Sequence, residues 1–144
     1  MIEIVKLKSG AEIASLLQLD HNNLKNSFNC EKTEWIQWLI NMVESEDVVI
    51  MACVVDGDLV NYTVLISHVY PPVQDSISIF YLCDTINFED KDGKKLRNRL
   101  LSEIKRWAIE QGAKKIDVFR KDIDFLNFFS FKEDKVFFKM TMEI

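Results

Sequence analysis

Residues 92–116 read DGKKLRNRLLSEIKRWAIEQGAKKI, and this stretch decides the fold class of the chain. Leu96, Leu100, Ile104 and Trp107 recur at helical spacing, so the pattern predicts an amphipathic helix over residues 94–111. Gly112 follows the last periodic residue, where glycine most easily adopts the left-handed conformation that ends a helix. The stretch therefore predicts a loop up to residue 93, a helix, a glycine stop and a strand over residues 115–119.

Positive charge is concentrated at the start of this predicted helix. The helix macrodipole disfavours cations at an N-terminus unless an anion lies there too. The pattern indicates either an anion-binding site or a solvated basic face. The basic residues are Lys91, Lys94, Lys95, Arg97 and Arg99.

The composition is that of one soluble globular domain over residues 1–144. Hydrophobic residues make up 48% and charged residues 28%, which excludes a disordered chain. The net charge of −5 disfavours a nucleic-acid partner, so the local basic patch favours a small anionic ligand. No leader and no apolar run of bilayer-spanning length is evident, so we expect no membrane partner and a cytoplasmic location.

The three cysteines are odd in number and share no CxxC spacing. We therefore expect neither a disulfide framework nor a metal site. Cys53 lies in an apolar run and is interpreted as a small buried hydrophobe.

The rest of the chain alternates between strand and helix patterns. A helix is expected from Ala11, frayed near residues 20–23, and a clearer one begins near Glu31 or Thr33. Asp56-Gly57 separates two strand-like runs and predicts a hairpin. A short helix is expected over 122–129 and an alternating strand pattern follows from residue 131. The other predicted strands span residues 2–7, 48–55, 59–70 and 76–84.

In the run 76–84, Ile77, Ile79 and Tyr81 alternate with Ser78, Phe80 and Leu82, so the two sets are expected on opposite faces. Because a strand–helix–strand unit follows an antiparallel meander, the chain order predicts an α/β (α+β) fold with a mixed sheet. One parallel crossover then runs through the helix over residues 94–111.

Residues 92–116 resemble the loop and helix of the GNAT superfamily of acyl-CoA-dependent N-acetyltransferases, which read RGKGIGxxLLxxIxxWAxxxGAKKI. Residues 124–131, DFLNFFSF, are similar to the family's xFYEKLGF segment, and residues 48–65 fit its second and third strands. The resemblance covers about residue 35 to the C-terminus. It implies a single GNAT-like domain whose mixed, mostly antiparallel central sheet is flanked by helices.

The resemblance also implies an acetyl-CoA-dependent N-acetyltransferase that acts on a primary amine, either a small molecule or a peptide. In that family the pyrophosphate lies on the helix N-terminus, and the pantetheine arm pairs with the end of the preceding strand. Carried over, the cofactor-binding positions are Leu82, Cys83, Lys94, Lys95, Leu96, Arg97, Asn98 and Arg99.

The sequence departs from the family pattern at positions that bear chemistry. Lys95 and Arg97 stand where the loop has glycines, and Leu126 stands where many members have a general-acid tyrosine. The alternative is therefore a catalytically inactive GNAT-shaped interaction module that has lost the acetyl-CoA site.

Catalytic candidates cluster near the end of the strand at 76–84. Asp84 is interpreted as the general base or as a cap of the next turn. Tyr81 is interpreted as an acid, as an orienting hydroxyl or as a core residue. Cys83 has no neighbouring base to make it a nucleophile, and His21 is expected at the surface.

Two groups of aromatic residues leave alternatives open. The first group, which includes one methionine, either lines an acceptor pocket or fills the core; its members are Phe28, Trp35, Trp38 and Met42. The phenylalanines between residues 125 and 138 indicate a dense local core or a homodimer contact.

Overall fold

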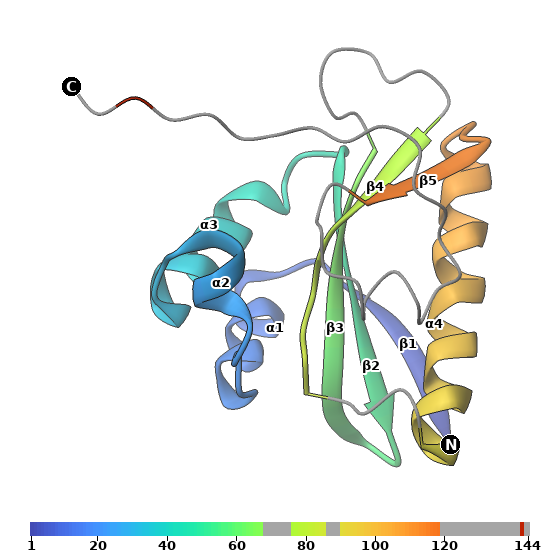
Figure 1. Ribbon diagram of the computed structural model, residues 1–144, viewed down its shortest axis with the longest axis horizontal. Coiled ribbons are helices and arrows are strands. Elements are labelled where there is room, and N and C mark those ends of the chain that lie inside the picture. The colour runs from blue at the N-terminus through green and yellow to red at the C-terminus, as the bar shows by residue number, and fades with distance from the viewer. Residues whose placement is uncertain (68–75, 86–89, 119–141, 143–144) are drawn as a thin grey trace.

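The protein is described by a computed structural model that defines residues 1–67, 76–85, 90–118 and 142 (Figure 1). The short helix expected over 122–129, the strand pattern from residue 131 and the end of the strand expected over 59–70 lie outside the described residues.

The described elements follow the order expected from the sequence. The strands are β1 (Ile2–Leu7), β2 (Val48–Val55), β3 (Asp58–Ile66), β4 (Ser76–Leu82) and β5 (Lys115–Val118). The helices are α1 (Gly10–Ala14), the 3₁₀ helix η1 (Ser15–Gln18), α2 (Leu24–Phe28), α3 (Lys32–Met42) and α4 (Lys91–Glu110).

The strands form one sheet in the order β1-β2-β3-β4-β5. The first four strands pair antiparallel, and β5 pairs parallel to β4 from Ser76↔Lys115 to Ile79↔Val118. The parallel pair is connected through α4, which is the crossover that the sequence predicted. The mixed, mostly antiparallel α/β architecture is therefore confirmed.

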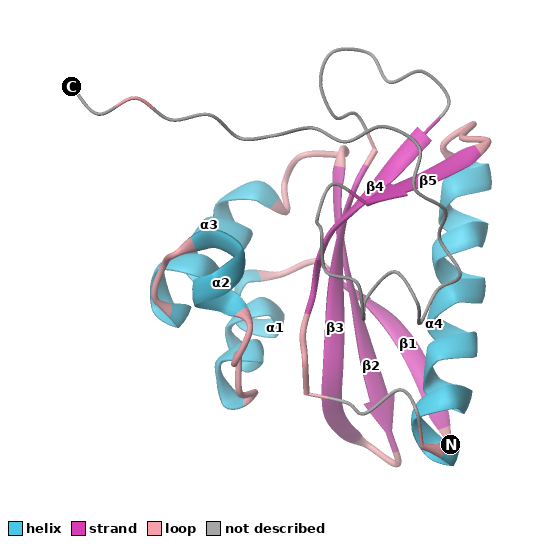
Figure 2. Ribbon diagram, in the orientation of Figure 1, coloured by secondary structure: helices cyan, strands magenta, loops and turns pink. Residues whose placement is uncertain are grey.

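Helices cover both faces of the sheet, with α1, α2 and α3 on one face and α4 on the other (Figures 1 and 2). Alternate residues of each strand enter the two cores, so Ile50 and Ala52 pack toward α1–α3 while Met51 and Cys53 pack toward α4. On α4, the buried side chains are Leu96, Leu100, Ile104, Trp107 and Ala108, which is the apolar stripe seen in the sequence.

A β-bulge interrupts the pairing of β3 with β4. Val64 lies opposite Tyr81 and Leu65 lies opposite Ile79, so Phe80 is an extra residue in β4. The bulge shifts the alternation by one residue, and Tyr81 packs in the α1–α3 core while Ile79 packs in the α4 core. The expectation that Tyr81 shares a face with Ile77 and Ile79 was therefore wrong.

The hairpin between β2 and β3 is confirmed. Its two-residue loop, Asp56-Gly57, has φ angles of 51° and 87°, and two successive positive φ values fit the right-handed twist of an antiparallel pair. The sequence signal and the backbone geometry agree here because the turn is encoded locally.

The helix expected from Ala11 is shorter and more broken than the sequence indicated. A capping box starts α1, because the Ser9 hydroxyl accepts from the Glu12 N–H and the Glu12 carboxylate accepts from the Ser9 N–H. The helix tightens into η1 after Ala14. The second helical segment, α2, forms separately. The expected start of the next helix is confirmed, since Glu31 is the N-cap of α3.

Helix α4 begins earlier than expected. The sequence predicted a loop up to Gly93, but the helix starts at Lys91, and the Asp90 carboxylate accepts from the Gly93 N–H at 2.7 Å as its N-cap. The other end is as predicted. Gly112 has φ 78°, and Ala113 N–H donates to the Ala108 carbonyl, which closes a Schellman motif.

Replacing Gly57 by alanine should lower the free energy of unfolding by about 1–2 kcal/mol, because a Cβ is strained at φ 87°. Gly10→Ala is the matched control. Its Cβ would meet the Ile40 Cγ2 at 3.5 Å, an ordinary contact in the first turn of α1, so it should leave stability unchanged or slightly raised. Urea unfolding of both variants checks this, and equal destabilisation would contradict it.

Candidate functional site

The end of β4 is held by a polar side chain buried in the sheet. Asn61 of β3 donates from its amide nitrogen to the Cys83 carbonyl at 2.6 Å and to the Thr85 hydroxyl at 2.9 Å. The Thr85 hydroxyl donates in turn to the Val60 carbonyl at 2.6 Å. These contacts fix the direction in which the chain leaves the sheet toward α4. Asn61 was not among the predicted site residues, although an asparagine within the apolar run of β3 is a sequence signal of a buried polar contact.

The loop between η1 and α2 is joined to the same strand end. The Tyr81 hydroxyl donates to the Asn23 side-chain oxygen at 2.6 Å, and the Asn23 amide nitrogen donates to the Leu82 carbonyl at 2.9 Å. The Asn22 N–H donates to Asp84 Oδ1 at 3.1 Å. Three predicted site residues, Tyr81, Leu82 and Asp84, are thus joined to a loop that the sequence indicated only as the frayed part of a helix.

A second chain of hydrogen bonds lies beneath this loop. Trp35 Nε1–H donates to the Tyr62 hydroxyl oxygen at 2.8 Å, and that hydroxyl lies 2.7 Å from His21 Nε2. His21 Nδ1 lies 2.9 Å from the Leu19 carbonyl, an acceptor, so the proton of the neutral ring belongs on Nδ1. Tyr62 then donates to Nε2. His21 is half-buried in this chain, which corrects the expectation that it lies at the surface.

Burial changes the acidity of several groups around the strand end. Burial is the main cause that raises the pKa of the Tyr62 and Tyr81 hydroxyls far above their ordinary value. Burial likewise raises the pKa of the Cys83 thiol to about 11. Cys83 is therefore a neutral thiol at physiological pH and lacks the thiolate that a nucleophile needs.

Asp84 differs from its neighbours because it is exposed at the end of β4. One carboxylate oxygen accepts from the Asn22 N–H, which orients the group at the opening next to the loop. A fixed, solvent-accessible carboxylate at a strand end can accept a proton from a ligand directly or through water.

The cations predicted to bind an anion lie on the first turns of α4, not in a loop before it. Lys94, Lys95 and Arg99 are exposed and Arg97 is half-buried. Within residues 1–67, 76–85 and 90–118, none of the four forms an ion pair.

The remaining predicted cofactor positions on α4 differ from one another. Leu96 is 3% exposed and packs in the core between α4 and the sheet, whereas Asn98 is exposed. The Lys94 N–H donates to the Asp90 carbonyl within the helix, and the Gly93 N–H is capped by the Asp90 carboxylate. Anion binding by these residues would therefore rest on side chains more than on backbone amides.

Four aromatic rings line an open pocket on the α1–α3 face. Neighbouring rings are nearly parallel, with centroids 4.8–5.7 Å apart and interplanar angles of 13–29°. We call this cavity of about 300 Å³ the aromatic pocket. Met42, which the sequence grouped with these residues, packs against the core and does not line it. The lining residues are Phe28, Cys30, Glu34, Trp35, Trp38 and Phe80.

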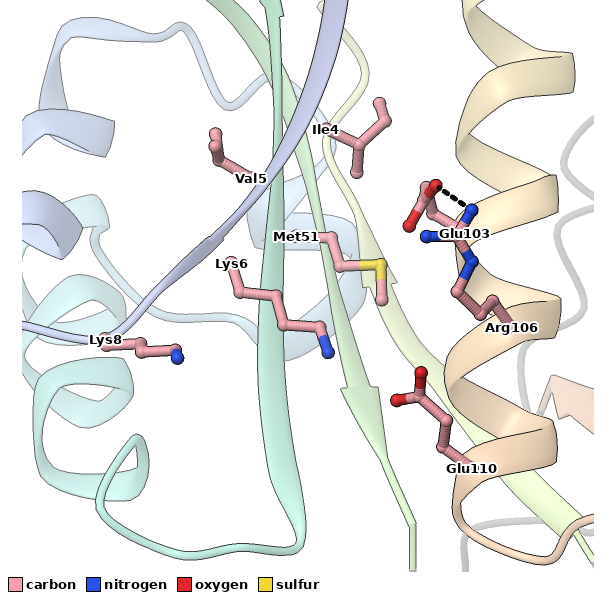
Figure 3. Close-up of a pocket in the computed structure, with 8 residues that line it drawn as sticks. All are labelled: Ile4, Val5, Lys6, Lys8, Met51, Glu103, Arg106 and Glu110. Carbon is pink, nitrogen blue, oxygen red and sulfur yellow. Dashed lines mark ion pairs between the residues drawn. The ribbon is translucent and has the colours of Figure 1, made fainter.

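A separate groove of about 370 Å³ lies between β1 and α4 (Figure 3). Lys6 and Lys8 come from β1 and its end, and Glu103 and Arg106 form an ion pair on α4 at 3.3 Å. Its charges are mixed in sign, so the groove carries no strong preference for an anion or a cation.

Two kinds of feature are absent from the described ranges 1–67, 76–85 and 90–118. No group of three or more histidine, cysteine, aspartate or glutamate side chains there is arranged to hold a metal ion. Likewise, no helix in those ranges combines the length and the apolar character needed to span a bilayer.

No protein-family model matches the sequence, and no curated protein matches it either. Solved structures match over nearly the whole chain. One is AAC(6')-Iy in complex with the bisubstrate analogue CoA-S-monomethyl-acetylneamine, with TM-score 0.71, 12% identity and 99% of each chain covered. Another is an aminoglycoside acetyltransferase from an uncultured soil metagenomic sample, with TM-score 0.67, 16% identity and 99% of each chain covered.

A third structure is the ribosomal-protein-alanine N-acetyltransferase from Brucella melitensis biovar Abortus. Its TM-score is 0.65 at 11% identity, and the match covers 99% of this chain and 100% of that one. The chain has the GNAT fold. Along this chain the bulged strand β4 is followed by helix α4, and the predicted site residues lie on α4, on β4 and directly after β4.

The stability of the folded chain should fall as the pH drops below about 6.5, the ordinary pKa of histidine. Burial lowers the pKa of His21 in the folded chain, so the unfolded chain takes up a proton at a higher pH than the folded one. The His21 contribution is thus fully present above the unfolded pKa and is lost as the pH falls. Urea unfolding at about pH 8 and about pH 5 should show a smaller loss in His21→Gln than in the wild type. An identical loss in both would contradict this.

Proposed function

We propose that this protein is an acetyl-CoA-dependent N-acetyltransferase that acts on a primary amine. The observation that supports it best is a bulged strand followed along the chain by a helix whose first turns carry cations that form no ion pair among the described residues. A strand end can pair with an extended amide-containing arm, and the cations complement a pyrophosphate. The likeness to the AAC(6')-Iy complex, which contains a CoA-based analogue, agrees with this proposal.

In this proposal the residues of α4 bind the anionic end of the cosubstrate. Arg97 is the central contact, because it is half-buried beside the apolar stripe of the helix and its guanidinium can bind a phosphate with two hydrogen bonds. Lys94, Lys95 and Arg99 add charge around it, with Asn98 as an exposed hydrogen-bonding neighbour. Leu96 contributes by packing the helix, and Leu82 and Cys83 provide the strand end.

When bound, acetyl-CoA supplies an activated thioester, whose acetyl carbon passes to the amine nitrogen as the carbon–sulfur bond breaks and the freed thiolate takes up a proton. Asp84 is assigned as the base that removes a proton from the bound ammonium, directly or through water, so that the neutral amine attacks the thioester carbonyl. Tyr81 is assigned an orienting role, because its proton is donated to Asn23 and its hydroxyl is buried.

One observation favours the alternative, a GNAT-shaped interaction module without the cosubstrate. Asp90 and Asp92 place two carboxylates at the start of α4, and Asp90 occupies the Gly93 N–H that could otherwise meet an anion. A negative charge at this position opposes a pyrophosphate.

Calorimetric titration with acetyl-CoA tests the proposal. Micromolar binding is expected, and Arg97→Gln should weaken it by about tenfold, or about 1.4 kcal/mol. Arg106→Gln is the matched control, since it removes the same charge from the same helix at a residue paired with Glu103. Absence of binding to the wild type, or equal weakening in both variants, would contradict the proposal.

Asp90→Ser should tighten acetyl-CoA binding by about two- to fivefold, because serine keeps an N-cap hydroxyl and removes the opposing charge. The same titration checks this. If the wild type does not bind but Asp90→Ser does, the helix start is a lost cosubstrate site and the interaction module is the better description. If Asp90→Ser binds more weakly than the wild type, the cap carboxylate does not oppose the ligand.

A further inference from the structure

The aromatic pocket presents ring surface to a ligand. Trp38 is 36% exposed and Phe28 and Phe80 are partly exposed, so part of the stacked cluster borders solvent. The face of an aromatic ring carries a partial negative charge, which attracts a cation held close to it. A cavity of about 300 Å³ lies at the small end of the range of roughly 300–1,000 Å³ for ligand sites.

Among the described residues that line the pocket, one carries a carboxylate. Glu34 lines the pocket and forms no ion pair within the described part of the chain, whereas the neighbouring Glu31 lies 3.6 Å from Lys25. The negative charge of Glu34 also acts on the thiol of Cys30, another residue that lines the pocket. Burial first, and then the charges of Glu34 and Glu31, raise the pKa of Cys30. An unpaired carboxylate beside ring faces complements a positive charge on an apolar body.

The pocket also adjoins the strand end discussed above. Phe80 is both a wall of the pocket and the extra residue of the β4 bulge. Trp35, another wall, contacts Tyr81 with ring centroids 5.1 Å apart. A ligand in the pocket would therefore lie next to the part of β4 that leads to Asp84.

We infer that the aromatic pocket binds arylalkyl- or alkylammonium ions, with the apolar body against the rings and the positive charge toward Glu34. The role of these ammonium ions as acceptor substrates of an acetyltransferase rests on the proposed function. Binding of the cation to the pocket does not. An aminoglycoside suits the pocket poorly, because rings, one thiol and one carboxylate cannot satisfy its many hydroxyl groups.

Calorimetric titration without acetyl-CoA tests the inference with two probes of the same shape. 2-Phenylethylammonium carries the charge, and 2-phenylethanol replaces it by a hydroxyl. We expect the cation to bind about tenfold more tightly than the alcohol, or about 1.4 kcal/mol. Neamine, a polyhydroxylated amine, should not compete with it.

Two substitutions locate the site. Glu34→Gln should remove most of the preference for the cation while keeping the shape of the side chain, and Trp38→Leu should weaken both probes. Glu46→Gln is the control, because it removes one exposed carboxylate outside the pocket and should change nothing. Circular dichroism of each variant confirms that it folds.

Several outcomes would overturn the inference. Equal affinities for the cation and the alcohol, or a preference that survives Glu34→Gln, would exclude charge recognition at this rim. Absence of binding by both probes would show that the pocket does not bind arylalkylammonium ions. None of these results depends on acetyl-CoA, so a protein that binds the cation but no acetyl-CoA would contradict only the proposed transfer activity.

Discussion

The β-bulge at Phe80 is the constraint on which the rest of the site depends. One extra residue in β4 turns Tyr81 away from α4 and into the core beneath α1–α3. Only from that face can its hydroxyl reach Asn23 and hold the loop against the strand end. The bulge also places the Phe80 ring next to the ring of Trp38. In a strand without the bulge, Phe80 of the aromatic pocket and the Tyr81 hydroxyl that bonds to Asn23 would lie on opposite faces of the sheet.

Locally encoded features were predictable from the sequence. The Asp56-Gly57 turn and the Gly112 stop each depend on backbone conformations that few residues adopt. Their positions can therefore be inferred from the local sequence alone. The overall order of strands and helices followed from periodicity. The bulge could not be found this way, because it is set by the register of β4 against β3 and both Tyr81 and Phe80 suit a strand.

For the candidate site, the charged residues could be identified from the sequence, but the start of α4 and the hydrogen-bond partners could not. The cations of α4 could be identified as a cluster, but whether the helix began at Lys91 or at Lys94 depended on Asp90 as a cap, and several residues could have served. The partners of His21 were hidden for a different reason. Tyr62 and Trp35 are 41 and 14 residues away in the chain, and only the packing of α3 onto the sheet brings them together.

The cations on the first turns of α4 would have a consequence for how the proposed anionic cosubstrate arrives. The chain carries a net charge of −5, whereas residues 91–99 hold five basic residues and one aspartate, so the local charge there is opposite in sign to that of the chain. Such an asymmetric field turns an approaching polyanion before contact and raises the rate of productive encounters. Salt shortens the reach of the field to roughly 8 Å at physiological ionic strength, so the protein would select its anions by association rate most effectively in dilute electrolyte.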